Sequence, residues 1–363
     1  MKIGILTHYN VNNQGAQLQM IAMKYYLEDM GHDVYILTYE KNFDFDREEA
    51  KKNSMSFRNF PYYLRKYFIE KGIRLTVFNI RKALAHKKSW KGLNFAPYDK
   101  NECDVIIIGS DEVFSIDVGC NKMMYGYGLG NVPAIAYAPA FGRTTEELLK
   151  EYDCYDLVKK GLTNMYALSA RDAHTKDMIF HMTGRRVPIV NDPVLLYNGS
   201  KFMVPIKRIK KQYILIYSYD RNMVDQEEVR NIKCYAKKHG LITVSLGTYH
   251  KWCNKNIVCN AREWYSYFKN ADCVITDTFH GSVVAIKNHC NVAVFIRKSI
   301  NAFKLESLLR ETGLESRRLK SISAGNLEYV LSKPIDYEKV DANIENALTV
   351  SKQYLSESLE KIS

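Results

Sequence analysis

The chain has 363 residues, more than one ordinary hydrophobic core accommodates, so we expect two domains. Its 46% hydrophobic and 25% charged residues are typical of a soluble globular protein, and its net charge of +12 favours anionic partners. No apolar stretch reaches membrane-spanning length, and the short apolar run at the N-terminus is unlike a signal peptide. We therefore expect a cytoplasmic protein.

The 8 cysteines indicate neither a disulfide framework nor a metal site. None forms a C-x-x-C pair, and several lie in apolar, strand-like runs, which is typical of reduced and buried thiols. His250, Cys253 and Cys259 are close in sequence, but their spacing lacks the paired pattern of a structural zinc site. We expect no metal.

The first 40 residues predict a βαβ unit. An apolar strand at 3–7 leads through a polar loop into a helix at 16–31, whose apolar residues recur at helical spacing. A second strand follows at 33–40. This order predicts a parallel sheet with a right-handed crossover.

A basic insert at about 45–95 interrupts that pattern. Between Lys51 and Lys91 the chain carries twelve Lys or Arg residues and one acid, Glu70, mixed with aromatic and aliphatic residues at roughly helical periods. We interpret it as one or two amphipathic helices that pack their apolar side on the first domain. The alternative is contact of 51–91 with a lipid-linked acceptor or with the inner face of the membrane.

The α/β alternation then resumes and continues to residue 333. Loop-like sequence at 198–211 separates two halves, so we predict an N-terminal Rossmann-like domain at 1–200 and a C-terminal one at 201–333. A long charged helix is expected at 334–363. Ligands of such sheets bind at the carboxyl ends of the strands, so we expect a cleft between the domains.

Four loops at strand ends carry candidate functional residues. Asn13 and Gly15 begin a helix and present backbone N–H groups, although an ordinary βα turn explains them equally well. Asp111, in GSDEVF, offers a carboxylate to a substrate hydroxyl or caps a helix. Arg171 ends a strand and suits a carboxylate or phosphate, or a surface ion pair. His280 stands at a strand–helix junction that suits an anion.

Six motifs resemble those of the polysaccharide pyruvyl transferase family, in the family's order. They are KIGILTHYNVNNQGAQLQ, DVIIIGSDEVF, AIAYAPAFG, LSARD, NDPVLL and NADCVITDTFHGSVVAIKN. Each is short, but the ordered set spans roughly residues 1–310. The resemblance implies a fold similar to the GT-B glycosyltransferases. It also implies transfer of pyruvyl from phosphoenolpyruvate to two hydroxyls of a sugar in a cell-surface polysaccharide or its precursor, with no cofactor or metal.

The resemblance also implies roles for individual residues. Arg171 would clamp the donor, His280 would bind it and serve as a candidate acid, and Asp111 would be the base for the acceptor hydroxyl. The other expected contacts are Asn13, Gly15 and Gln17 on the acceptor side, and Arg143, Thr278, Phe279, Gly281 and Ser282.

The chain departs from the family pattern at three positions. Some relatives carry Arg where this chain has Thr278, so Arg143 or Arg297 would have to complete the anion clamp. Many bacterial relatives read G-S-D-Q-x-W, whereas this chain has Glu112 and Phe114. These changes bear on the identity of the acceptor.

Two other classes of function fit the same pattern. A sugar-nucleotide glycosyltransferase would share the cleft and would need a carboxylate for ribose, for which Glu263 and Asp277 are candidates. A non-catalytic binding protein would have a degenerate clamp, with Thr278 and Glu112 as its best support. Nucleic-acid binding is not expected, because the basic run has no recognisable motif.

Overall fold

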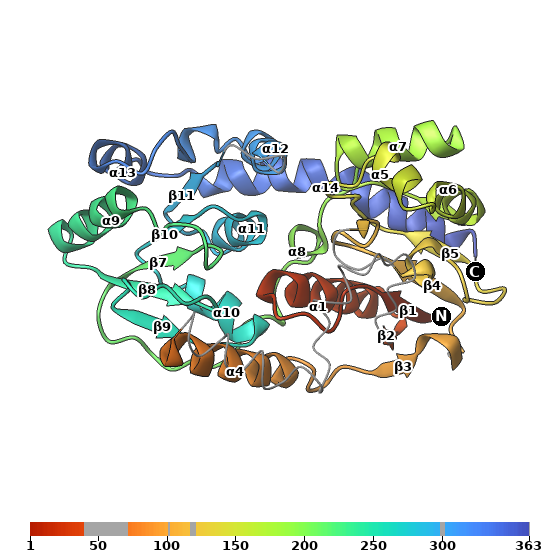
Figure 1. Ribbon diagram of the computed structural model, residues 1–363, viewed down its shortest axis with the longest axis horizontal. Coiled ribbons are helices and arrows are strands. Elements are labelled where there is room, and N and C mark those ends of the chain that lie inside the picture. Colours follow the sequence, from red (N-terminus) through yellow and green to blue (C-terminus); the bar gives the residue numbers. More distant parts are fainter. Residues whose placement is uncertain (40–71, 101, 117–120, 298–301, 363) are drawn as a thin grey trace.

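The computed structural model describes residues 1–39, 72–100, 102–116, 121–297 and 302–362, and its two sheets confirm the prediction of two Rossmann-like domains. Each sheet has six parallel strands and helices on both faces (Figure 1). The first has the order β3 (Phe95–Pro97), β2 (Asp33–Thr38), β1 (Lys2–Leu6), β4 (Val105–Ile108), β5 (Ala134–Ala136) and β6 (Ala167–Leu168). The second has the order β12 (Arg318–Leu319), β11 (Val292–Phe295), β10 (Cys273–Thr276), β7 (Tyr213–Tyr217), β8 (Ile242–Leu246) and β9 (Lys255–Ile257).

The helices of the first domain are α1 (Gln14–Asp29), α4 (Ile73–Lys88), α5 (Glu146–Glu151), α6 (Tyr155–Asn164), α7 (Ala173–Thr183) and α8 (Pro193–Leu196). Those that follow are α9 (Gln226–Lys238), α10 (Ala261–Phe268), α11 (Phe279–Lys287), α12 (Ala302–Thr312), α13 (Ala324–Leu331) and α14 (Tyr337–Glu360). Of the predicted basic insert, α4 lies within the described residues, and 45–71 lies outside them.

The sequence TTEELLKEYDCYDLVKKG predicts one helix at 144–161, capped by Thr144 or Thr145, but the structure has two helices there, α5 and α6. Thr145 caps α5 as predicted, through a hydrogen bond from Leu148 N to its hydroxyl. The chain then turns at Asp153, whose φ of 52° is outside the helical range and ends the ladder of hydrogen bonds. The spacing of the apolar residues gives no sign of a helix break at a single residue.

One continuous apolar core joins the two domains. Side chains of β1, α1 and α8 pack in the same cluster as those of β10, α10 and α11. The contact is close at Gly247, where a Cβ would lie 2.2 Å from Gln14 Nε2 on α1. Arg262 of α10 donates a hydrogen bond of 3.1 Å to the Tyr25 hydroxyl of α1. The domains therefore meet along α1, and an open cleft is left only beside this contact.

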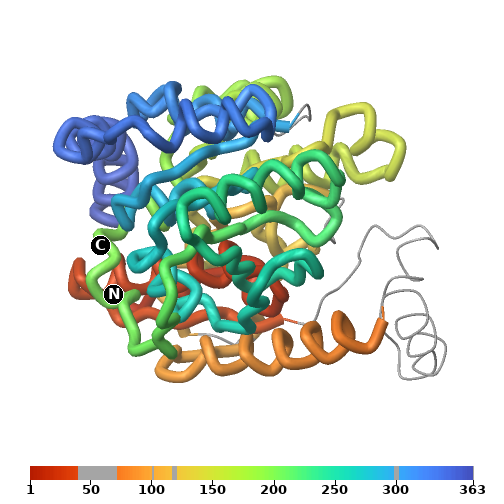
Figure 2. The backbone as a smooth tube through the Cα atoms, turned by 90° about the vertical axis from the view of Figure 1, so that its left-hand side faces the viewer, coloured from red at the N-terminus to blue at the C-terminus, as the bar shows by residue number. Residues whose placement is uncertain are grey.

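The last helix, α14, runs back from the second domain to the first (Figure 1). It packs on α12 and α8, and its Tyr354 hydroxyl donates a hydrogen bond of 2.9 Å to Ala136 O, in β5 of the first sheet. Ser351 Oγ donates to Asn191 Oδ1 at 3.0 Å. This helix therefore fixes the relative position of the domains from the side opposite α4, which lies at the far edge of the molecule in both Figures 1 and 2.

Candidate active site

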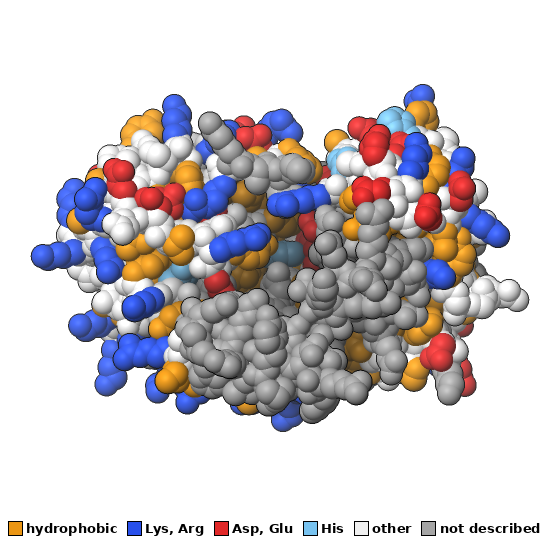
Figure 3. Space-filling view, viewed as in Figure 1, with side chains coloured by type: hydrophobic (Ala, Val, Ile, Leu, Met, Phe, Trp, Pro, Cys, Tyr) orange, Lys and Arg blue, Asp and Glu red, His pale blue; other side chains and the backbone are white. Residues whose placement is uncertain are grey.

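A cleft of 520 Å³ lies where the carboxyl ends of strands from both sheets converge. The molecule is hollowed between its two halves in Figure 3, with Lys and Arg side chains at the rim. Five Lys or Arg side chains and three carboxylates line the cleft: Arg143, Arg171, Arg221, Arg297 and Lys304, and Asp111, Glu112 and Asp277. We call this cavity the central cleft. Its excess of cations suits an anionic ligand.

Four side chains, which we call the Arg171 cluster, form a continuous set of charge contacts beside the central cleft. Arg171 Nη1 lies 3.3 Å from Asp111 Oδ1 and 3.6 Å from Asp192 Oδ2. His280 Nε2 lies 3.3 Å from the same Asp192 oxygen. Asp111 and Arg171 follow β4 and β6 of the first sheet, whereas His280 begins α11 of the second domain. The cluster therefore bridges the two domains.

Asp192 is the buried centre of this cluster. Its side chain is 0% exposed, and its Oδ1 accepts a hydrogen bond of 2.9 Å from Val194 N, which caps α8. Burial opposes its ionised form, but His280 and Arg171 outweigh burial and lower the pKa of Asp192 below its usual range. The ionised Asp192 thus lies within hydrogen-bond reach of the His280 ring.

Asp111 also stays ionised. Burial alone would raise its pKa, but Arg171, His280, His8 and Lys304 together lower the pKa of Asp111 to about 2. The two carboxylates raise the pKa of Arg171 above its usual value, against the effect of burial. Arg171 Nε is buried and has no hydrogen-bond partner among the described residues, so the guanidinium retains unused donor capacity.

His280 is packed against the first turn of α1. A Cβ on Gly15 would lie 2.4 Å from His280 Nδ1, far inside van der Waals contact, so only glycine fits there. Asn13 caps α1 through a hydrogen bond of 2.9 Å from Gly15 N, and Thr278 caps α11 through one of 3.1 Å from Gly281 N. Two helices, one from each domain, thus begin at the central cleft, and their N-terminal dipoles favour negative charge there.

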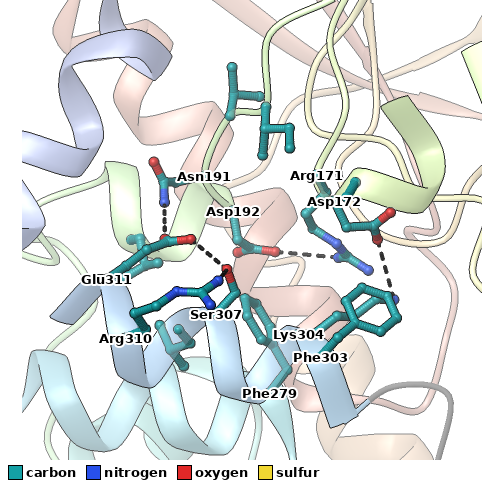
Figure 4. Close-up of a pocket in the computed structure, with 15 residues that line it drawn as sticks. Arg171, Asp172, Asn191, Asp192, Phe279, Phe303, Lys304, Ser307, Arg310 and Glu311 are labelled. Atoms are coloured by element: carbon teal, nitrogen blue, oxygen red, sulfur yellow. Dashed lines mark hydrogen bonds and ion pairs between the residues drawn. The ribbon is translucent and has the colours of Figure 1, made fainter. Parts of the chain in front are cut away.

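A second cavity, the rear pocket of 320 Å³, adjoins the central cleft behind Arg171. Figure 4 shows Arg171 and Asp192 on one side and α12, with Lys304 and Ser307, on the other. Lys304 Nζ lies 3.0 Å from Glu112 Oε1, and burial lowers the pKa of Lys304 below its usual value despite that partner. The two cavities share Arg171, Phe279 and Lys304, and Asp192 belongs both to the cluster and to the lining of the rear pocket.

A second arginine, whose side chain is partly exposed, forms what we call the Arg297 cluster in the C-terminal domain. Arg297 Nε lies 2.7 Å from Asp277 Oδ2, and its Nη2 lies 3.0 Å from Glu228 Oε2. Asp277 also accepts hydrogen bonds from Ser218 Oγ at 2.7 Å and from Asn222 Nδ2 at 2.9 Å. Its carboxylate is therefore fully engaged within the protein.

A third cavity, the side pocket of 370 Å³, continues from the central cleft toward α4. Asn13, Tyr219 and Arg221 line both spaces, and Lys82 of α4 lines the side pocket alone. Burial lowers the pKa of Lys82 below its usual value, although Asp220 opposes that effect. The side pocket has charged and amide side chains in its lining and is large enough for part of a second substrate.

The central cleft brings together seven of the residues predicted from the sequence: Asn13, Asp111, Arg143, Arg171, Thr278, Phe279 and His280. Gly15 touches His280 without lining the cleft. Gln17 does not reach it: its side chain is fully buried, donates to the carbonyls of Tyr9 and Val11, and accepts from Trp90 Nε1 at 3.1 Å.

Two further predicted residues serve the start of α11. Gly281 admits the close approach of Thr276 Oγ1, 2.4 Å from where its Cβ would be, and the buried Ser282 donates a hydrogen bond of 2.9 Å to Thr278 O. Neither lines the central cleft. Glu263, considered for a nucleotide ribose, accepts from Asn260 N in the capping box of α10 and lies elsewhere.

The sequence analysis missed Asp192 and Lys304 as site residues. Asp192 lies in the NDPVLL motif, where an acid before proline indicates a cap of a short helix and gives no sign of a partner 88 residues away. Lys304 lies on α12 among residues with an ordinary amphipathic pattern. No cluster of three or more metal-binding side chains occurs in the ranges that the structure describes.

Solved structures with a similar fold are enzymes of sugar metabolism. Trehalose-6-phosphate synthase from Burkholderia multivorans is 10% identical, with a TM-score of 0.52 over 99% of this chain and 98% of that one. UDP-GlcNAc 2-epimerase from Neisseria meningitidis is 12% identical, with a TM-score of 0.51 over 99% and 100%. UGT89C1 from Arabidopsis thaliana, solved with UDP-L-rhamnose, is 9% identical, with a TM-score of 0.52 over 99% and 98%. At these identities the likeness concerns the fold alone, which is GT-B-like.

Sequence comparison identifies the family. No curated protein sequence matches the chain. The sequence profile of the polysaccharide pyruvyl transferases matches residues 13–299, which is most of the chain and includes the whole Arg171 cluster. The chain therefore belongs to the polysaccharide pyruvyl transferase family and is a transferase.

Proposed function

We propose that this transferase moves pyruvyl from phosphoenolpyruvate to two hydroxyls of one sugar, in a cell-surface polysaccharide or its precursor, and forms a cyclic ketal. The Arg171 cluster is the observation that carries the proposal. It combines an arginine with unused donors, a histidine held by a buried carboxylate and a helix N-terminus, all beside one cleft. A donor with a carboxylate and a phosphate requires such a set of cations and N–H groups.

Arg171 would bind the donor, and Arg143 would complete the clamp in place of the arginine that some relatives have at Thr278. Arg143 is exposed, lines the central cleft and has no ion pair within the described part of the chain. Arg297 is the weaker candidate, because its three nitrogens already bond Asp277 and Glu228. The backbone N–H groups that begin α11, around Phe279, would add to the clamp.

The chemistry has two additions and one elimination. Protonation of the donor's methylene carbon makes the central carbon an electrophile, and the first sugar hydroxyl adds there and loses its proton. The C–O bond to phosphate breaks, and the second hydroxyl adds to the same carbon, which closes the ketal. Of the two hydroxyl protons, one balances the proton taken by the methyl group and the other leaves with inorganic phosphate.

His280 would supply the proton to the methylene carbon. The Asp192 carboxylate lies 3.3 Å from Nε2 of the ring, and the contact with Gly15 fixes the orientation of the ring. Asp111 was predicted as the base for the acceptor hydroxyl. With a pKa of about 2 it is a weak base, so we assign it to accept a hydrogen bond from that hydroxyl and to orient Arg171.

The acceptor would enter from the side that Asn13 and the side pocket form. Tyr219 and Arg221 connect that pocket to the central cleft, and aromatic faces and amides suit a sugar. An activated, phosphorylated donor is made inside the cell, so the same proposal puts the enzyme in the cytoplasm. The structure has no helix, within the residues that it describes, with the length and hydrophobicity to cross a membrane.

The test compares ligands on the intact protein. Phosphoenolpyruvate should raise the melting temperature saturably, whereas UDP and inorganic phosphate at the same concentration should raise it less. Incubation with phosphoenolpyruvate and a panel of sugar acceptors should release phosphate only where an acceptor gains the mass of one ketal-linked pyruvyl group. Stabilisation by UDP but not by phosphoenolpyruvate would favour a sugar-nucleotide glycosyltransferase and reject the proposal.

A further inference from the structure

Helix α4 carries an apolar stripe that faces away from the protein. Ile73, Val77, Ile80 and Leu84 are 66%, 41%, 56% and 59% exposed, and their spacing of four, three and four residues aligns them along one face. The exposed side of a helix in a globular protein is ordinarily polar. Four exposed aliphatic side chains in one row therefore need an explanation.

The opposite face of α4 attaches it to the rest of the molecule. Phe78 is 7% exposed, and its ring lies 5.5 Å from that of Tyr249. His86 is also buried, and Ser89, at the end of the helix, accepts a hydrogen bond of 3.2 Å from Ala261 N of α10. These contacts dock one face of α4 on the C-terminal domain, whereas the sequence predicted packing on the first domain. The apolar stripe takes no part in that docking.

Cations flank the apolar stripe. Arg74, Arg81 and Lys88 follow one another at seven-residue intervals on one side of it, and Lys87 lies on the other. Residues 72–98 contain six Lys or Arg and no Asp or Glu. None of these four flanking cations forms an ion pair with any residue in the described ranges. Figures 1 and 2 both show α4 along one outer edge of the molecule.

We propose that α4 is a membrane-docking helix, which lies in the interface of an anionic bilayer with its apolar stripe in the acyl region. The stripe spans about 16 Å along the helix, too short to cross a bilayer and suited to lie in its surface. Cations on both sides of the stripe match anionic headgroups, each worth about 1 kcal/mol near the surface. A second copy of the same helix would bring like charges together, so self-association through this face is disfavoured.

Docking through α4 would place the bilayer close to the substrate-binding region. Lys82 points from the same helix into the side pocket, which opens into the central cleft. A membrane surface under α4 would thus lie one helix diameter from a polar cavity of the enzyme. This proposal concerns where the protein works, and its test needs no pyruvyl transfer.

The test is co-sedimentation of the full-length protein with vesicles. Wild-type protein should bind phosphatidylcholine vesicles containing about 30% phosphatidylglycerol, and bind pure phosphatidylcholine roughly tenfold more weakly. Raising the salt from about 0.05 M to about 0.5 M should weaken the anionic binding. Equal binding to both vesicle types, or none to the anionic ones, overturns the proposal.

Three variants separate the contributions of the apolar stripe and of the flanking cations to vesicle binding. The stripe variant V77Q/I80Q/L84Q and the charge variant R74Q/R81Q/K88Q should each lose roughly tenfold or more in partition to anionic vesicles. The control M203Q/V224Q/V350Q removes exposed apolar side chains elsewhere, at 41%, 59% and 48% exposure, and should bind as wild type does. An unchanged melting temperature and retained stabilisation by phosphoenolpyruvate would show that the fold and the donor site are intact. A stripe variant that binds vesicles normally but dissociates a wild-type dimer would assign this face to a second copy instead.

Discussion

The Arg171 and Arg297 clusters contain the same types of side chain but differ in how many guanidinium nitrogens are hydrogen-bonded within the protein. Each has an arginine after a strand, held by two carboxylates at the edge of the central cleft. Arg297 uses Nε and both Nη atoms within the protein, whereas Arg171 bonds carboxylates through Nη1 alone, and its Nε has no partner among the described residues. Within the described residues the donors of Arg297 are therefore fully used, whereas under our proposal a ligand would complete the contacts of Arg171.

The largest expected difference between the two clusters is in the effect of exchanging each arginine for lysine. R171K keeps the charge but loses the planar fork of donors, so pyruvyl transfer should fall by about 10²–10³-fold and stabilisation by phosphoenolpyruvate should disappear. R297K should lower the free energy of unfolding by about 1–3 kcal/mol and keep the phosphoenolpyruvate shift. Thermal-shift titration and phosphate release measure both. The opposite pattern would exchange the roles of the clusters.

His86 provides a third case, a buried side chain that lines none of the three cavities described above. Neither of its ring nitrogens has a partner in the described structure, and burial lowers the pKa of His86 to about 4. As pH falls from about 6.5, His86 is protonated in the unfolded chain but stays neutral in the folded protein. The free energy of unfolding therefore falls until pH reaches about 4.

Because of His86, the free energy of unfolding should be about 2 kcal/mol lower at pH 5 than at pH 7.5, and H86L should not show this decrease. Denaturant titration at the two pH values measures the difference. H181L is the control, because His181 is exposed and pairs with Glu146. An identical acid loss in wild type and H86L would contradict the assignment.

Gly15 connects the Arg171 cluster to the other domain. G15A would put a methyl group 2.4 Å from His280 Nδ1, so the ring must move away from its position near Asp192. Displacement of a catalytic group by about 1 Å costs up to roughly 10²-fold in rate, and we expect a loss of about 10–10²-fold with little change in melting temperature.

The matched control for this substitution is G325A. Gly325 is also in the first turn of a helix, but a Cβ there has no neighbour within 4 Å. Its activity should equal that of wild type. Normal turnover by G15A would mean that His280 does not need this contact.

The sequence predicted which strand-end loops form this site better than it predicted which side chains contact one another there. Strand-end loops identified Asp111, Arg171 and His280, because parallel sheets bring the carboxyl ends of their strands to one edge. Gln17 lies in the first turn of α1, close in sequence to its cap Asn13, yet its side chain faces the interior and hydrogen-bonds the preceding loop. Which polar side chain points outward depends on the helix phase relative to the other domain.

Asp192 illustrates what local sequence does not contain. Its cap of α8 is predictable from the following proline, but its contacts with Arg171 and His280 join residues 21 and 88 positions away and depend on how the domains pack. The same holds for Arg297. From the sequence it was a candidate to complete the anion clamp, whereas in the structure Asp277 and Glu228 already pair with it.

The smallest expected effect is that of substituting Asp111. It tests whether Asp111 orients the acceptor hydroxyl and Arg171 or acts as the catalytic base. Because the pKa of Asp111 is about 2, the carboxylate contributes no titration step between about pH 5 and pH 8. D111N should therefore lower kcat/KM by about tenfold while the shape of its pH profile is kept, because one hydrogen bond to the acceptor and one to Arg171 are weakened. D111E, which retains the charge, should recover part of the loss. If instead D111N removed an acidic limb that wild type shows, Asp111 would be the titrating base, and the closed ion pair with Arg171 would have to open when the substrates bind.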